Sequence, residues 1–189
     1  MRLKANTSSE WVTAVLADFD SFLLDHAACE RKASATAMSL VAHYPDRKEL
    51  VGAMIDLARE ELEHFHLVYQ KIAERGLTLA SDKKDPYVGR LAREHREGSR
   101  AYFLDRLLLS GIVEARGCER FGLVAAALPP GDLKDFYKAI ARSEIRHEDL
   151  FFNLDRVYFD APEIEARLAD LLEIEARVIR DLPLRAAVH

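Results

Sequence analysis

The sequence is poor in the residues that disulfide-rich and strand-rich proteins need. Its 189 residues include two cysteines, six prolines and eight glycines. Cys29 and Cys118 belong to no C-x-x-C pair and cannot form a disulfide framework. So few turn residues, with no alternating apolar pattern, argue against a sandwich or barrel of short strands. We therefore expect a mostly helical protein in a reducing compartment, the cytoplasm.

Long apolar runs and a strong net charge are also missing. No apolar run approaches the roughly 18 residues that a membrane helix needs, and the N-terminus has no secretory pattern. The formal net charge of -5 gives no global reason to bind nucleic acid or an anionic membrane. With 49% hydrophobic residues the chain is not disordered. We expect a single domain over residues 1–189 without a membrane partner.

Apolar residues recur at helical spacing along almost the whole chain. Two connections between long helices are short enough for antiparallel hairpins, and the middle one, of about ten residues, is long enough to cross a four-helix bundle. An all-α four-helix bundle with a long central crossover and extra terminal helices is therefore expected. Asp46 is the expected cap of the second long helix, and Gly98 the expected interruption of the third. The expected helices cover residues 9–16, 19–43, 47–75, 86–128, 132–159 and 162–182.

The chain also contains an internal repeat. Residues 58–64 and 141–147 both read A-R-x-E-(L/I)-x-H. A lone glutamate precedes each copy, 31 residues before the repeated glutamate in the first case and 30 in the second. Each of the four glutamates lies in mid-helix on the apolar face that should be buried. Two hairpins are thus expected to present matching acidic groups to the core.

Buried carboxylates are costly unless a cation compensates them. A glutamate and a histidine three residues apart share a helix face, so each E-x-x-H supplies one carboxylate and one imidazole. Four carboxylates and two imidazoles are the ligand count for two iron or manganese ions in a bundle core, and they suit structural zinc less well. The expected ligands are Glu30, Glu61, His64, Glu114, Glu144 and His147. An open alternative is that the core glutamates pair with Arg59, Arg116 or Arg142.

Residues near the expected ligands have two interpretations each. Asp25 and His26 lie about one turn before Glu30 and either support it by hydrogen bonds or form a structural pair. Gly111 and Gly117 lie about one turn on either side of Glu114 and either leave space for oxygen or substrate or serve helix packing.

Basic residues recur at helical spacing in the crossover and the helix that follows it. We interpret them as either a solvated face or a nucleic-acid patch on one side of that helix. They are Lys83, Lys84, Arg90, Arg93, Arg96 and Arg100.

Four segments resemble one enzyme family. They are residues 24–33 (LDHAACERKA), 57–65 (LAREELEHF), 114–121 (EARGCERF) and 143–147 (SEIRH), with residues 85–87 (DPY) in addition. These segments are similar to the tRNA-(2-methylthio-N6-isopentenyladenosine) hydroxylases, and the likeness spans nearly the whole chain.

The resemblance implies a ferritin-like di-iron monooxygenase. Its six ligands would bind two iron ions, O2 would be the co-substrate, and an external reductase would supply electrons. The substrate would be the isopentenyl group of a modified adenosine beside the tRNA anticodon, which makes the basic residues the candidate tRNA face. Two other classes remain open, namely iron oxidation or storage and hydroxylation of a small molecule such as a quinone.

Overall fold

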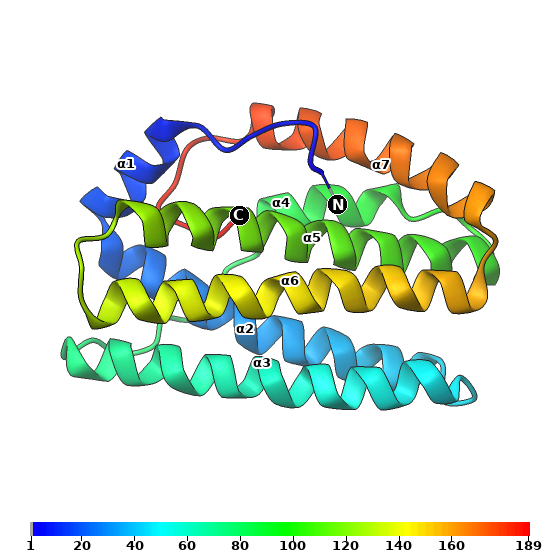
Figure 1. Cartoon of the computed structure of the whole chain (residues 1–189), viewed down its shortest axis with the longest axis horizontal. Coiled ribbons are helices and arrows are strands. Elements are labelled where there is room, and N and C mark those ends of the chain that lie inside the picture. The colour runs from blue at the N-terminus through cyan, green and yellow to red at the C-terminus, as the bar shows by residue number, and fades with distance from the viewer. Residues whose placement is uncertain (1) are drawn as a thin grey trace. The chain divides into compact units, whose positions relative to one another are not determined.

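A computed structural model describes residues 2–189, and these residues contain helices and no strand. They form two compact units, residues 13–83 with 185–188 (the α2–α3 unit) and residues 2–12 with 84–184 and 189 (the α5–α6 unit). The elements in Figure 1 are α1 (Ser9–Ala17), α2 (Phe19–His43), α3 (Lys48–Glu74), α4 (Pro86–Leu91), the 3-10 helix η1 (Ala92–Glu94), α5 (Ser99–Ala127), α6 (Asp132–Tyr158) and α7 (Ala161–Asp181).

In the α2–α3 unit, two long helices form an antiparallel hairpin (Figure 1). The Asp18 carboxylate caps α2 by accepting the backbone N–H of Ser21 at 3.2 Å. The expected cap of α3 at Asp46 is wrong, because the chain first makes a turn in which the Arg47 N–H donates to the Tyr44 carbonyl at 3.2 Å. The α3 helix therefore begins one residue later than expected, with Arg47 at the cap position.

In the α5–α6 unit, α5 and α6 form a second antiparallel hairpin (Figure 1). Gly131, with φ of 147°, makes the tight connection that a side chain would resist. The Lys134 ammonium donates to the carbonyls of Leu128 at 2.7 Å and Ala126 at 3.1 Å, so it satisfies acceptors that the end of α5 leaves unpaired. The α7 helix packs against both α5 and α6, and α4 packs against α7.

The helix expected over residues 86–128 is interrupted, as its sequence predicts. The Asp85 carboxylate caps α4, which has Pro86 in its first turn, and α4 passes into η1. Gly98 then adopts a φ of 89°, in the left-handed region that favours glycine, and α5 begins at the next residue. The interruption decides where the basic residues of this segment point.

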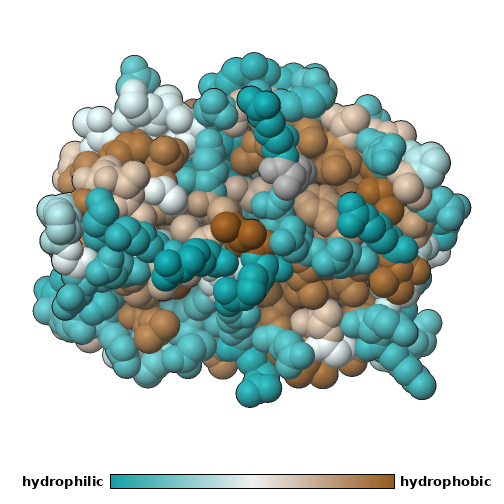
Figure 2. Space-filling view, viewed as in Figure 1, coloured by the Kyte–Doolittle hydropathy of each residue, from teal (hydrophilic) through white to brown (hydrophobic). Residues whose placement is uncertain are grey.

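No helix among residues 2–189 is both long and apolar enough to cross a membrane. The face shown in Figure 2 is largely hydrophilic, with smaller hydrophobic patches between the polar residues. Larger exposed apolar side chains are scattered over several helices and include Leu62 on α3 and Val157 on α6. Such scattered exposure is ordinary for a folded protein.

Candidate metal centre

Three of the expected ligands converge inside the α2–α3 unit. Glu30 comes from α2, and Glu61 and His64 come from one face of α3. Each offers one donor atom, and the three atoms lie within 4.8 Å of one another. His64 Nδ1 lies 3.5 Å from Glu30 Oε2 and 3.9 Å from Glu61 Oε2. All three side chains are buried, and Glu61 is only 1% exposed. We call these residues the α2–α3 triad.

His26 supports the first carboxylate of this triad. Its Nε2 atom lies 2.5 Å from Glu30 Oε1, and both side chains are buried. Burial raises the pKa of Glu30, but the charge and hydrogen bond of His26, with hydrogen bonds from the other two triad residues, lower it below its usual range. Asp25 has a structural role instead, because it accepts the backbone N–H of Val188 at 2.7 Å.

The other three expected ligands converge in the same way inside the α5–α6 unit. Glu114 comes from α5, and Glu144 and His147 come from α6. Their donor atoms also lie within 4.8 Å of one another, and His147 Nδ1 lies 3.4 Å from Glu144 Oε2. Glu144 and His147 are buried, and Glu114 is half-buried. We call these residues the α5–α6 triad.

A matching hydrogen bond joins the two helices of each hairpin beside its triad. The Ser34 hydroxyl donates to the Ala58 carbonyl at 2.8 Å, and the Cys118 thiol donates to the Ala141 carbonyl at 3.5 Å. Both donors lie four residues after the first glutamate of their triad, and both acceptors are the alanine that opens the repeated segment. Burial, with nearby carboxylates, raises the pKa of the Cys118 thiol to about 11, so it remains a donor. The sequence repeat is therefore also a structural repeat.

The arginines considered as alternative partners for the core glutamates are engaged elsewhere. Arg59 and Arg142 are exposed on the outer surfaces of their helices. Arg116 is fully buried, but it binds Glu175 of α7 at 2.7 Å and also Glu119. Arg59, Arg116 and Arg142 therefore do not neutralise the glutamates of the two triads.

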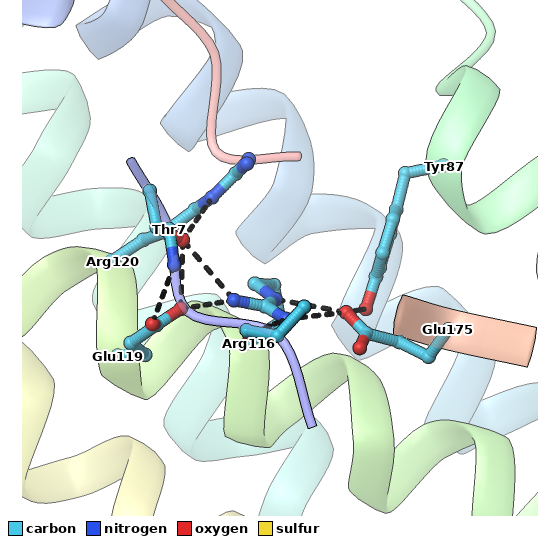
Figure 3. A network of polar contacts seen from close by, with 7 residues as sticks. Thr7, Tyr87, Arg116, Glu119, Arg120 and Glu175 are labelled. Carbon is cyan, nitrogen blue, oxygen red and sulfur yellow. Dashed lines mark hydrogen bonds and ion pairs between the residues drawn. The ribbon is translucent and has the colours of Figure 1, made fainter. Parts of the chain in front are cut away.

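Figure 3 shows the network around Arg116. One carboxylate oxygen of Glu175 accepts hydrogen bonds from the Arg116 guanidinium and from the hydroxyl of Tyr87, a buried residue of α4. The second bond is 3.0 Å long. Three helices, α4, α5 and α7, are joined by this network. The sequence offered little to predict it, because Arg116 and Glu175 are 59 residues apart.

Residues 116–120 of α5 also bind an N-terminal segment, residues 5–11, whose Thr7 is shown in Figure 3. The backbone N–H and hydroxyl of Thr7 donate to Glu119 at 2.8 and 2.7 Å. The Ala5 carbonyl accepts the Arg116 guanidinium at 2.8 Å, and the Arg120 guanidinium lies 4.6 Å from the centre of the Trp11 ring. Arg116, Glu119 and Arg120 of the EARGCERF segment thus have a structural role.

Gly111 is explained by helix packing. A Cβ atom at this position would lie 3.1 Å from Phe152 Cζ and 3.3 Å from Phe151 Cβ. The space that its missing side chain leaves is therefore occupied by the Phe152 ring. At Gly117 a Cβ atom would make only an ordinary contact, 3.7 Å from Phe121.

The basic residues do not lie on one face of a single helix, so the expectation of a shared helix face is wrong. The break at Gly98 distributes Arg90, Arg93, Arg96 and Arg100 over α4, η1, the following link and α5. Arg96 pairs with the buried Asp105 at 2.9 Å, and Arg100 pairs with Glu163 at 2.7 Å. Arg100 stays exposed in spite of its pair, and the exposed members of the set that no carboxylate pairs with are Lys83, Lys84, Arg90 and Arg93.

The donor set of each triad fits a divalent metal ion. Two carboxylates and one imidazole suit metals such as iron and manganese, which accept hard oxygen together with nitrogen ligands. Carboxylates gathered in a buried position require positive charge nearby, and a metal ion supplies it. Each hairpin therefore holds a buried cluster of glutamate and histidine that is compatible with a metal site.

Comparisons with known proteins agree with this description. The sequence model of the family described as tRNA-(MS[2]IO[6]A)-hydroxylase (MiaE) matches residues 1–189. A Pseudomonas putida protein named tRNA 2-(methylsulfanyl)-N(6)-isopentenyladenosine(37) hydroxylase is 36% identical over 166 residues, 88% of this chain and 80% of that protein. A Salmonella typhimurium protein of the same name is 30% identical over 155 residues, 82% of this chain and 56% of that protein.

A solved structure is also similar, that of a Synechococcus protein described as protein 43 with aldehyde deformylating oxygenase activity. It is 35% identical, the match covers 100% of this chain and 96% of that one, and the TM-score is 0.95. This match confirms the all-α, ferritin-like fold class expected from the sequence. Because the family model matches the full length, the chain belongs to the tRNA-(MS[2]IO[6]A)-hydroxylase (MiaE) family.

Proposed function

We propose that this protein is an O2-dependent di-iron monooxygenase that hydroxylates the isopentenyl group of 2-methylthio-N6-isopentenyladenosine in tRNA. The observation that carries the proposal is the repeated, buried triad of two glutamates and one histidine in a chain of this family. Two relatives that carry the name of this activity align with more than four-fifths of the chain. The whole chain then acts as one ferritin-like domain, in the cytoplasm, with tRNA as its substrate.

The two triads would hold two iron ions. The bound iron supplies the dioxygen chemistry, and an external reductase returns the electrons. The chain's own residues bind and orient the metal and keep water away from it, since five of the six side chains are buried and the sixth is half-buried. The ligands are Glu30, Glu61, His64, Glu114, Glu144 and His147.

Contacts with tRNA fall to the exposed basic residues that have no carboxylate partner, because Arg96 and Arg100 are bound to carboxylates of the protein itself. Arg90→Glu combined with Arg93→Glu should weaken tRNA binding and reduce its salt dependence. Arg59→Glu, an exposed arginine of the other unit, is the control. Equal affinity and equal salt dependence in all three proteins would place the tRNA face elsewhere.

Nucleoside analysis of tRNA tests the function directly. Cells that lack the protein should accumulate the unhydroxylated isopentenyl nucleoside, and the wild-type gene should restore the hydroxylated form. Glu114→Ala and His147→Ala should not restore it and should bind less than the about two iron ions per chain expected of the wild type. The exposed Arg142→Ala is the control. Full hydroxylation without the protein, in cells with no second hydroxylase, would contradict the proposal.

Aldehyde deformylation is a second candidate, because the Synechococcus structure with that described activity is 35% identical over the whole chain. Both activities are compatible with the same ligands, so the substrate assay decides between them. Consumption of an aldehyde by the iron-loaded protein, together with unchanged tRNA nucleosides, would favour this candidate. No observation on the fold or the site favours iron storage or quinone hydroxylation.

A further inference from the structure

A cavity of about 430 Å³ lies between α6 and α7 inside the α5–α6 unit, and none of the expected metal ligands lines it. We call it the α6–α7 cavity. Its volume falls in the range of sites that bind small ligands, roughly 300–1,000 Å³. Apolar side chains of both helices line it, among them Phe152, Ile164, Leu168 and Leu172. The unit thus contains a concave apolar surface that the metal centre leaves unused.

Polar side chains share this cavity with the apolar ones. They are the cations Arg2 and Arg156, the carboxylates Asp149 and Glu165, and the amide Asn153. All five are exposed, and within residues 2–189 none of their side chains makes a hydrogen bond or an ion pair. Charges of both signs therefore line one cavity without pairing with each other, and each can still bind a ligand.

Phe152 brings the cavity close to the metal ligands. A Cβ atom at Gly111 would lie 3.1 Å from Phe152 Cζ and 3.3 Å from Phe152 Cε2, so the edge of this ring contacts α5. Gly111 is three residues, about one helical turn, before Glu114. One turn of α5 therefore separates the wall of the cavity from a ligand of the α5–α6 triad, and a molecule bound in the cavity would lie beside the site of the chemistry.

The groups that line the cavity match the chemistry of an unpaired nucleotide. Proteins bind such a nucleotide by stacking its base on an aromatic ring and by hydrogen bonds to the edge of the base. Phe152 supplies the ring, and the Asn153 amide supplies both a donor and an acceptor. Arg156 follows Phe152 by four residues, so its guanidinium shares that helix face and can bind the phosphate. The carboxylates can accept N–H groups of a base or the 2′-hydroxyl of the ribose.

The mixture of charges disfavours two other occupants. The carboxylates would repel the rows of phosphates that a duplex presents, so a duplex backbone fits this surface poorly. A hydrocarbon chain would contact the apolar side chains but would cover charged groups without pairing them, which costs free energy. A single nucleotide that enters with its base first satisfies both kinds of side chain.

We propose that the α6–α7 cavity binds one unpaired nucleotide of the tRNA substrate, with its base on Phe152 and its phosphate at Arg156. The inference rests on the proposed function, because it takes tRNA as the substrate. A free nucleotide offers the same chemistry, so the experiment includes one as a separate probe.

Fluorescence anisotropy of a labelled anticodon stem-loop RNA measures its affinity for the iron-loaded full chain, without reductant so that no turnover takes place. Phe152→Ala should raise the Kd by about 5–150-fold, the cost of one lost base stack. Phe152→Tyr keeps the ring and should keep most of the affinity. Arg156→Glu should weaken binding and reduce its salt dependence. Val157→Ala, at an exposed position of the same helix, is the matched control and should bind as the wild type does.

Two further probes identify the source of the nucleotide. An RNA duplex without a loop presents no unpaired base, so wild type and Phe152→Ala should bind it equally. Equal losses on duplex and stem-loop, or a stem-loop affinity that Phe152→Ala leaves unchanged, would overturn the inference. So would Phe152→Ala abolishing the binding of AMP alone, since the cavity would then take a free nucleotide. If Phe152→Ala does not fold, Asn153→Ala at its exposed position still decides, because it should weaken binding of the stem-loop and not of the duplex.

The failure of this inference differs from the failure of the proposed function. A wild type that binds the stem-loop with an affinity that no cavity variant changes would refute the role of the cavity and leave tRNA as the substrate. A wild type that binds neither the stem-loop nor the whole tRNA would contradict the proposed function itself.

Discussion

Asp155 should make the protein less stable as the pH rises from 6 to 8. This residue of α6 is fully buried, and neither carboxylate oxygen has a hydrogen-bond partner among the described residues. Burial, which outweighs the effect of Arg156, raises its pKa to about 8. In the unfolded chain an aspartate titrates near pH ~3.9. Between the two values the folded state keeps a proton that the unfolded state has released, so stability falls as pH rises.

The size of the effect follows from the two pKa values. The loss of stability begins above pH ~4, grows by about 1.4 kcal/mol per pH unit, and levels off above pH ~8 at roughly 6 kcal/mol. From pH 6 to pH 8 the loss increases by about 2 kcal/mol, because the folded carboxyl group itself begins to ionise near its pKa. Asp155→Asn removes the titration and should remove this increment.

The pH-dependent loss of stability can be measured by urea denaturation of the metal-free protein at pH 6, 7 and 8, followed by far-UV circular dichroism. The free energy of unfolding of Asp155→Asn, relative to the wild type, should increase by about 2 kcal/mol over this range. Asp149→Asn, an exposed position on the same helix, should follow the wild type at every pH. If wild type and Asp155→Asn lose stability in parallel, the raised pKa is refuted.

Two further changes test the packing of the α5–α6 unit by urea denaturation. Arg116→Ala leaves the buried Glu175 without its partner cation and should cost about 3–5 kcal/mol, whereas the exposed Arg142→Ala should have little effect. Gly111→Ala forces a Cβ atom against Phe152 and should cost about 1–3 kcal/mol. Gly122→Ala on the same helix meets nothing within 4 Å and should stabilise by up to about 1 kcal/mol. Equal stability of the two glycine variants, or of the two arginine variants, would contradict this account.

The helices could be predicted because their evidence is local. Apolar periodicity and breakers such as Gly98 act over a few residues, and the structure follows both. The exact start of α3 was missed because the turn before it is closed by a backbone bond between Arg47 and Tyr44, and any residue at these positions supplies the same groups. The convergence of Glu30, Glu61 and His64 was also predictable, since their positions repeat in the second hairpin.

The partners of charged side chains could not be predicted in the same way. The sequence shows where Arg96 and Arg100 lie, but their ion pairs depend on Asp105 and Glu163, which only the folded chain brings to them. Likewise, the arginine-rich part of α5 suggested a counter-ion for the core, whereas Arg116 instead binds an α7 carboxylate far along the chain. Long-range ion pairs leave no periodic pattern to detect.

The segment that α5 holds contains Trp11, the one tryptophan of the chain. Its ring is 2% exposed and lies beneath the Arg120 guanidinium. All tryptophan fluorescence of this protein therefore originates at one contact between the N-terminal segment and α5. Its emission reports when that segment detaches, while circular dichroism reports when the helices melt. A fluorescence transition that precedes the dichroism transition would identify this contact as the first part of the unit to open.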